Sequence, residues 1–175
     1  MRTIQKNIYQ FSELSEEAKE KAVRKLFYIN VDHNWWGGTY DDAENIGLKI
    51  TSFGLDRNRH ANGEFIKSAP EVALLVCSEH GKDCDTYKTA AAFLSEYDSL
   101  VEKYSDGINK NVVSEGNEYE FDKEADELET EFLSNLLEDY ATILEREYEY
   151  LTSEKAIIET IEANGYEFTE DGKLI

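Results

Sequence analysis

The longest regular pattern of apolar and polar positions runs from Asp122 to Leu151, a stretch that contains neither Gly nor Pro. Its apolar positions are Leu128, Phe132, Leu133, Leu136, Leu137, Tyr140, Ile143, Leu144, Tyr148 and Leu151. Spacings of three and four residues place these side chains on one face of an α-helix. At 1.5 Å per residue the helix would be roughly 45 Å long. The pattern predicts one long helix with its apolar face in the core.

The opposite face of this predicted helix is acidic. Its outer positions are Glu124, Glu127, Glu131, Glu138, Glu145 and Glu149, flanked by Asp126, Asp139 and Glu147. Like charges three or four residues apart destabilise a helix by a few tenths of a kcal/mol per pair. A solubilising surface is one interpretation of this face. The other is a binding surface that imitates DNA, which carries about one negative charge per 1.7 Å of duplex axis.

The N-terminal part alternates shorter strands and helices. We expect a strand over 3–11 and a helix from Ser15, a natural N-cap, to about residue 30. A shorter helix should follow up to Gly47, distorted at Gly37-Gly38. Residues 48–55 and 59–66 should form a hairpin with a bulge or close approach at Gly63. Together with 3–11, this hairpin predicts a three-stranded antiparallel sheet.

The remaining segments are mostly helical. Pro70 suits the first turn of a helix that ends at Gly81, and Asp85 or Thr86 should cap the next helix, to about residue 104. The polar segment 105–119 should be a loop. After the long helix we expect a short one from Thr152-Ser153-Glu154 and a hairpin around Asp171-Gly172. The fold class expected is α+β, predominantly helical with a small antiparallel sheet. Its two parts, 1–114 and 115–175, should form one compact unit.

Charge narrows the classes of partner. The 175 residues include 38 acidic and 18 basic ones, a net charge of −20, and 115–149 holds fourteen acids against two bases. Such a field repels nucleic acid and anionic membrane and attracts basic protein surfaces. Two cysteines make no disulfide framework, and no apolar run is long enough to span a membrane. We therefore expect a cytoplasmic protein.

Catalytic and metal-binding signatures are weak. The sequence contains no GxSxG, HExxH, P-loop or GxGxxG motif. A site drawn from His80, Cys84 and a carboxylate matches no established zinc spacing, and Asp41-Asp42-Glu44 lacks calcium-loop spacing. A cysteine–histidine nucleophile using Cys77 or Cys84 is chemically conceivable. We expect no catalytic residue, metal or cofactor, and no enzymatic activity.

Two further stretches are candidate contacts. Trp35 and Trp36, if helical, point about 100° apart, so one should anchor the core and the other should lie near the surface. Plain core packing is one interpretation of the pair, and a partner contact, for which Trp35 is the candidate, is the other. The basic stretch from Arg57 to His60 should pair with the acidic helix; the alternative is a contact with a small anion.

Four stretches resemble a group of small phage and prophage proteins labelled "antitoxin of toxin–antitoxin stability system". They are FSELSEEAKEKA, INVDHNWWGGTYDDAENIGLKI, HGKDCDTYKTAAAFL and EKAIIETIEANGYEFTEDGKLI. The resemblance implies a mobile-element origin, and small acidic phage proteins commonly disable a host defence enzyme. It transfers no functional residue.

Three hypotheses follow. The first is an anti-CRISPR or anti-restriction inhibitor that docks its acidic helix on the nucleic-acid groove of a host nuclease, with the CRISPR effector Cas9 as the leading candidate. The second is an antitoxin that neutralises a basic toxin. The third is a small metal-dependent enzyme using Cys84 and His80. The apolar face of the long helix would also allow a homodimer.

Overall fold

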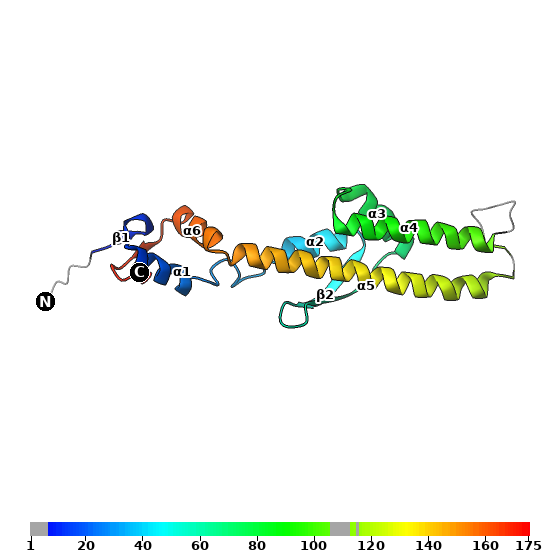
Figure 1. Cartoon of the computed structure of the whole chain (residues 1–175), viewed down its shortest axis with the longest axis horizontal. Helices are drawn as coiled ribbons and strands as arrows, with labels where there is room; N and C mark the ends of the chain where they lie inside the picture. The colour runs from blue at the N-terminus through cyan, green and yellow to red at the C-terminus, as the bar shows by residue number, and fades with distance from the viewer. Residues whose placement is uncertain (1–6, 106–112, 115) are drawn as a thin grey trace. The chain divides into compact units, whose positions relative to one another are not determined.

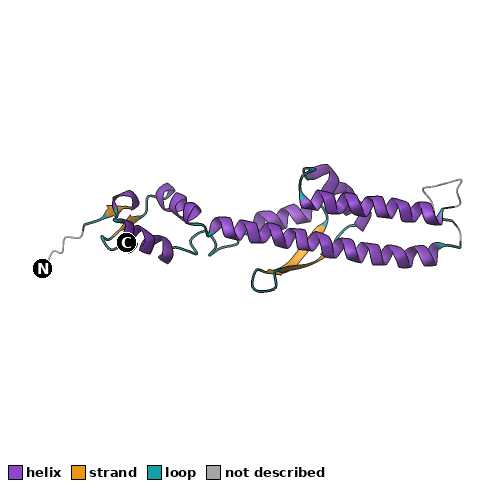
Figure 2. Cartoon of the chain, in the orientation of Figure 1, coloured by secondary structure: helices purple, strands orange, loops and turns teal. Residues whose placement is uncertain are grey.

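The computed structural model describes residues 7–105, 113–114 and 116–175. Helices predominate, and the described strands form two separate two-stranded antiparallel sheets (Figure 2). The α+β class expected from the sequence is therefore confirmed. None of the helices in these ranges is both long enough and apolar enough to cross a membrane.

The chain folds as two compact units. The first joins Met1–Trp36 to Arg146–Ile175, and the second is Gly37–Glu145. This division differs from the expected parts 1–114 and 115–175, whose boundary falls inside the second unit. The reason is packing across that boundary: the rings of Phe93 and Phe132 stack with centroids 4.3 Å apart.

The first unit contains short elements from both ends of the chain (Figure 1). They are β1 (Tyr9–Gln10), the 3-10 helix η1 (Phe11–Glu13), α1 (Glu16–Lys25), α6 (Glu154–Ala163) and β4 (Glu167–Phe168). Their core is Phe11, Leu14, Ala18, Ala22, Ile157, Ile161 and Phe168. The Oγ of Ser15 accepts a hydrogen bond from the backbone N–H of Ala18, so the predicted N-cap is confirmed.

Helix α1 ends at Lys25, earlier than expected. The Leu26 N–H donates to the carbonyls of both Ala22 and Val23, and turns follow. Asn30 then bonds to the structure around α6: its amide donates to the Leu151 carbonyl, and its Oδ1 accepts from the Thr160 hydroxyl. A continued helix would remove Asn30 from these two partners.

The expected three-stranded sheet is wrong. Residues 3–6 of the expected first strand lie outside the described residues, and β1 pairs antiparallel with β4, with Tyr9 opposite Phe168. The C-terminal hairpin supplies this partner, since Phe168 also bridges to Leu174 and Gly172 turns at φ +74°. A hairpin around 171–172 is thereby confirmed.

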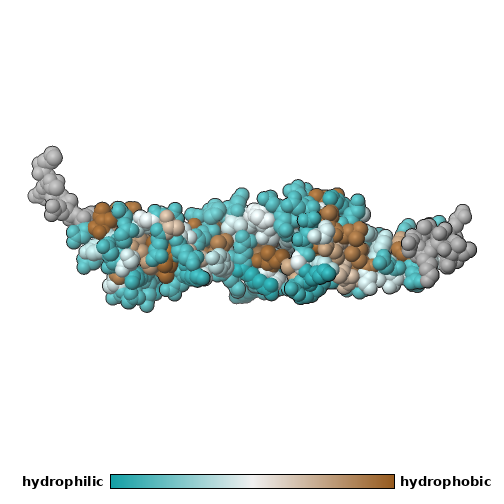
Figure 3. All heavy atoms as spheres, turned by 90° about the horizontal axis from the view of Figure 1, so that it is seen from above, coloured by the Kyte–Doolittle hydropathy of each residue, from teal (hydrophilic) through white to brown (hydrophobic). Residues whose placement is uncertain are grey.

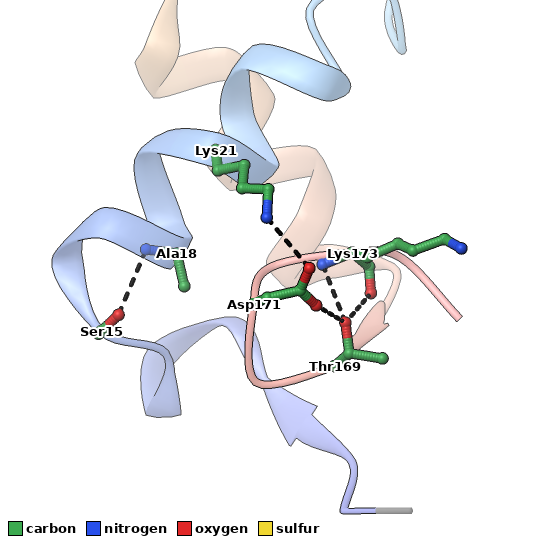
Figure 4. A network of polar contacts seen from close by, with 6 residues as sticks. All are labelled: Ser15, Ala18, Lys21, Thr169, Asp171 and Lys173. Carbon is green, nitrogen blue, oxygen red and sulfur yellow. Dashed lines mark hydrogen bonds and ion pairs between the residues drawn. The ribbon is translucent and has the colours of Figure 1, made fainter.

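Polar contacts hold this hairpin against α1 (Figure 4). Lys21 Nζ lies 3.0 Å from Asp171, which also accepts a hydrogen bond from the Thr169 hydroxyl at 2.5 Å. These two donors, Thr169 first, lower the pKa of Asp171 to about 2. A Cβ on Gly172 would collide with the Ala18 carbonyl, so the hairpin approaches α1 at backbone distance.

The second unit packs helices around a hairpin. Its elements are α2 (Gly37–Asn45), β2 (Leu48–Gly54), β3 (His60–Phe65), α3 (Ala69–Glu79), α4 (Asp85–Tyr104) and most of α5 (Glu118–Leu151). The core includes Leu48, Val72, Val76, Phe93, Phe132, Leu136 and Tyr140. Strand β3 approaches closely at Gly63, where a Cβ would lie 2.5 Å from the Lys49 carbonyl oxygen, as the sequence predicted.

Three helix starts refine the expectations. Helix α2 begins at Gly37, so Gly37-Gly38 form its first turn and do not distort its middle. Pro70 lies in the first turn of α3, as predicted. The N-cap of α4 is Cys84, and Asp85 is its first residue, where a carboxylate interacts favourably with the helix dipole.

Helix α5 confirms the predicted long helix and begins at Glu118, before the expected Asp122. Its buried residues are Ala125, Phe132, Leu136, Leu137, Tyr140, Ala141 and Leu144. Ile143 was expected on this face but is 36 % exposed.

Candidate functional site

The predicted acidic residues fall into two groups, those with intramolecular partners and those without. Glu124 belongs to the first group, because Lys103 Nζ lies 2.6 Å from its carboxylate and the Tyr104 hydroxyl donates to it at 3.1 Å. Hydrogen bonds from Lys103 and Tyr104 lower the pKa of Glu124. This acid is therefore ionised but already neutralised.

Arg59 neutralises two more acids. Its guanidinium donates to Glu138 and, at 2.6 Å, to Glu145. These glutamates lie seven residues apart, two turns along one side of α5, and the fork of the guanidinium spans them. The expected pairing of the basic turn with the acidic helix is confirmed for Arg59.

Two other acids are partly buried. The Asp139 carboxylate accepts a hydrogen bond from the Thr89 hydroxyl at 2.7 Å, and burial raises the pKa of Asp139. Burial also raises the pKa of Glu129, with a further contribution from the charge of Asp126. Because these groups face protein, they add little to the field that a partner would meet.

The second group consists of exposed acids. Asp126, Glu127, Glu131 and Glu149 have no ion-pair partner within the part of the chain that the structure describes. Glu120, which the sequence analysis did not single out, is also exposed and shares a side of α5 with Glu127 and Glu131. Glu147 is half-buried and has an interaction partner.

A groove lies between α4 and α5. It comprises two adjoining cavities of about 320 and 490 Å³ that share Glu96, Leu128 and Glu131. Its apolar lining is Ala92, Phe93, Leu100, Leu128 and Phe132, and its charged lining is Lys88, Glu96, Lys103, Glu124, Glu127 and Glu131. Exposed acids therefore border an accessible apolar strip. The sequence predicted Glu127 and Glu131 on the outer side of the long helix. It could not predict the groove, because the groove is formed by two helices together.

The tryptophan pair differs from expectation. Trp35 and Trp36 are both half-buried, so the expected split into one core and one surface residue is wrong. They precede α2 in a turn, where the helical angle of 100° does not apply. Their rings meet edge to face at 5.7 Å, and the Trp35 ring lies 5.7 Å from that of Tyr148. A partner contact at Trp35 stays a prediction.

A buried polar network was not foreseen from the sequence. The Thr86 hydroxyl lies 2.8 Å from His80 Nδ1, and His80 Nε2 lies 3.5 Å from an Asp42 oxygen that also accepts the Tyr140 hydroxyl at 2.7 Å. In the arrangement that fits these distances, the Thr86 O–H donates to Nδ1 and the Nε2–H is directed at Asp42, although Nε2 is buried and makes no hydrogen bond.

Enzymes that use a side-chain hydroxyl as nucleophile have the same order of groups, in which an imidazole lies between the hydroxyl and a carboxylate. Thr86 is only 2 % exposed and Tyr140 is fully buried, so no substrate reaches the hydroxyl. The network instead connects α2, the end of α3, α4 and α5. Its members are far apart in sequence, and local patterns could not reveal it.

The described residues give little support for a metal site or for a cysteine nucleophile. Across residues 7–105, 113–114 and 116–175, no group of three or more His, Cys, Asp or Glu side chains is placed to hold a metal ion. Burial raises the pKa of Cys77, which opposes formation of a thiolate nucleophile. Cys84 is exposed at the start of α4.

Comparison with known proteins gave no match to a family model, and no curated protein or solved structure proved similar to the chain.

Proposed function

We propose that this protein is a non-enzymatic inhibitor from a mobile element. It acts in the host cytoplasm, where its acidic surface occupies the basic nucleic-acid-binding groove of a host defence nuclease of the CRISPR or restriction type. The observation that supports this function is the stripe formed by Glu120, Glu127 and Glu131, exposed on a well-packed helix. No cation of the described residues pairs with them.

The charge of this stripe sets the expected mode of binding. Its three carboxylates lie along roughly 16 Å of α5, about one every 8 Å, compared with one charge per roughly 1.7 Å along duplex DNA. The stripe therefore carries less negative charge per unit length than duplex DNA. We therefore expect the stripe to dock by charge complementarity, with fast association and strong salt dependence, and not to reproduce the charge spacing of the duplex.

The same charges disfavour two other partner classes. Phosphate backbones and anionic lipid surfaces would be repelled by an acidic stripe that lacks a compensating cation. A small basic toxin would be attracted as a nuclease groove is, so the antitoxin alternative must be separated by experiment.

The test uses two triple variants with the same change of charge. E120Q/E127Q/E131Q removes the stripe, and E20Q/E162Q/E170Q removes three exposed acids of the first unit. Each protein is immobilised and exposed to bacterial lysate at low and high salt, and captured nucleic-acid enzymes are then assayed for cleavage with each protein added. Purified Cas9 with its guide RNA is included as a defined target.

The proposal expects a nuclease that binds the wild type and the control variant, elutes with salt and is inhibited in cleavage. The stripe variant should bind it at least about tenfold more weakly. Equal binding and inhibition by both triple variants would contradict the proposal. Capture of a small basic toxin, with no nuclease inhibited, would support the antitoxin instead.

A further inference from the structure

The groove between α4 and α5 is lined along several turns of both helices. Phe93 and Phe132 stack beneath it, and α4 presents Ala92 and Ser99 along its edge. Both of these small residues are exposed and cannot cover the apolar lining. The lined part of α4 runs from Lys88 to Lys103, roughly 22 Å, which matches a helix of about 15 residues.

The charged residues that line the groove indicate which kind of molecule could bind there. The cations that line the groove are already engaged, Lys88 with Asp85 and Lys103 with Glu124. Glu96, Glu127 and Glu131 line it without an ion-pair partner among the described residues. A second copy of the chain, with a net charge of −20, would be repelled, as would nucleic acid.

We propose that the α4–α5 groove binds a basic amphipathic helix of a partner protein. The partner's apolar side chains, spaced three or four residues apart, contact Leu100, Leu128 and the ring edges of the stacked pair. Its Lys or Arg side chains flank that strip and pair with Glu96, Glu127 and Glu131. This inference rests on the proposed function and adds an apolar component to it, because the acidic stripe alone would bind any basic surface.

The exposed apolar residues elsewhere do not support a competing site. On the face shown in Figure 3, apolar residues emerge in separate patches among hydrophilic ones. The exposed large side chains of the described residues, such as Tyr28, Leu74 and Tyr119, lie on different elements. None of these three lines either of the two cavities that form the groove.

The test titrates isotopically labelled protein with three synthetic peptides and follows its backbone amides by NMR. The first peptide is a helix of about 15 residues with Leu on one face and Lys on its flanks. In the second, Ser replaces Leu, and in the third, Gln replaces Lys. The first should perturb amides of 88–103 and 124–135 saturably, and the other two should bind at least about tenfold more weakly.

Tryptophan substitutions then separate shape from charge. A92W fills the groove and leaves every acid in place, whereas S95W adds the same side chain to an exposed position of α4 that does not line the groove. We expect A92W to weaken binding of the Lys/Leu peptide at least about tenfold and S95W to leave it within about twofold. S99W provides a second obstruction if A92W unfolds.

Several results would overturn the inference: equal binding of the Lys/Leu and Lys/Ser peptides, unchanged binding by A92W, or shifts in the same amides on self-association of the free protein. The two proposals fail separately. If A92W still inhibits a nuclease that E120Q/E127Q/E131Q does not, the inhibitor function stands without the groove. If the peptide binds the groove and no nuclease is inhibited, the groove stands without that function.

Discussion

The hydrogen bond between Tyr140 and Asp42 should cost unequal amounts of stability when removed from its two ends. Tyr140 is fully buried, whereas the Asp42 side chain is 52 % exposed. Y140F removes the buried donor and leaves a carboxylate that water can solvate. D42A removes the acceptor and leaves the buried phenol hydroxyl of Tyr140 without its hydrogen-bond partner.

The magnitudes follow from this asymmetry. A hydrogen bond to a charged group contributes about 1.5–3 kcal/mol, and half-exposure of the carboxylate moves Y140F to the lower end, about 1.5 kcal/mol. An unsatisfied buried polar group costs about 1–3 kcal/mol, and the full burial of the Tyr140 hydroxyl moves D42A to the upper end, about 2–3 kcal/mol. Because the partners are in direct contact, Y140F/D42A should cost less than the sum of the single variants.

The pH dependence provides a second test of the same contact. Burial, with the hydrogen bond and charge of Asp42, holds the pKa of Tyr140 above its usual range. A raised pKa contributes stability that is present below the unfolded value, about 10, and is lost as the pH rises above it. Y140F should therefore lose less stability between about pH 9 and 11 than the wild type does.

The assay is native-state hydrogen exchange of amides in α2 to α4 and in α5 up to Glu145, all of which belong to the second unit. Urea titrations at pH 7 give the free energies of opening for the wild type, both single variants and the double variant. The reasoning is refuted if Y140F costs as much as D42A, or if the double variant is strictly additive. Parallel curves for Y140F and wild type at alkaline pH would refute the assignment of the Tyr140 titration.

Three further outcomes are expected from thermal unfolding. G63A should destabilise by about 1–3 kcal/mol, because its Cβ would lie 2.5 Å from the Lys49 carbonyl oxygen; G38A, with open space around it, should be neutral or stabilising by up to about 1 kcal/mol. F132A should cost about 3–5 kcal/mol, because Phe132 is 2 % exposed and stacked in the core. Burial raises the pKa of Asp139, so D139N should gain less than about 1 kcal/mol at pH 7, and this gain should shrink as the pH falls through the raised pKa of the wild-type carboxyl. A loss of stability in D139N at pH 7 would contradict this.

Most helices could be predicted because their signals are local. Ser15 caps α1, Pro70 lies in the first turn of α3, and the apolar period of α5 matches its buried face. Strand pairing could not be predicted in the same way. Tyr9 pairs with Phe168, and nothing within a strand of two residues identifies a partner at the other end of the chain. The three-stranded sheet was the nearest arrangement in sequence, and it was wrong.

At the candidate site, too, the sequence could predict local features but not contacts between distant residues. Which acids share a side of α5 could be predicted from the sequence, because helical spacing alone determines this. It could not show which acids are neutralised. Lys103 reaches Glu124 across the connection between α4 and α5, and Arg59 reaches Glu138 and Glu145 from the hairpin.

The net charge of the chain therefore overstates the negative charge that a binding partner would encounter. Of the acids between 115 and 149, three are paired with Lys103 or Arg59, and burial raises the pKa of Glu129 and Asp139. Those left exposed in the second unit cluster on the first half of α5, where α4 leaves an apolar strip open beside them. A solubilising surface has no reason to place its unpaired acids along such a strip. This coincidence of charge and shape favours a binding surface over simple solubility.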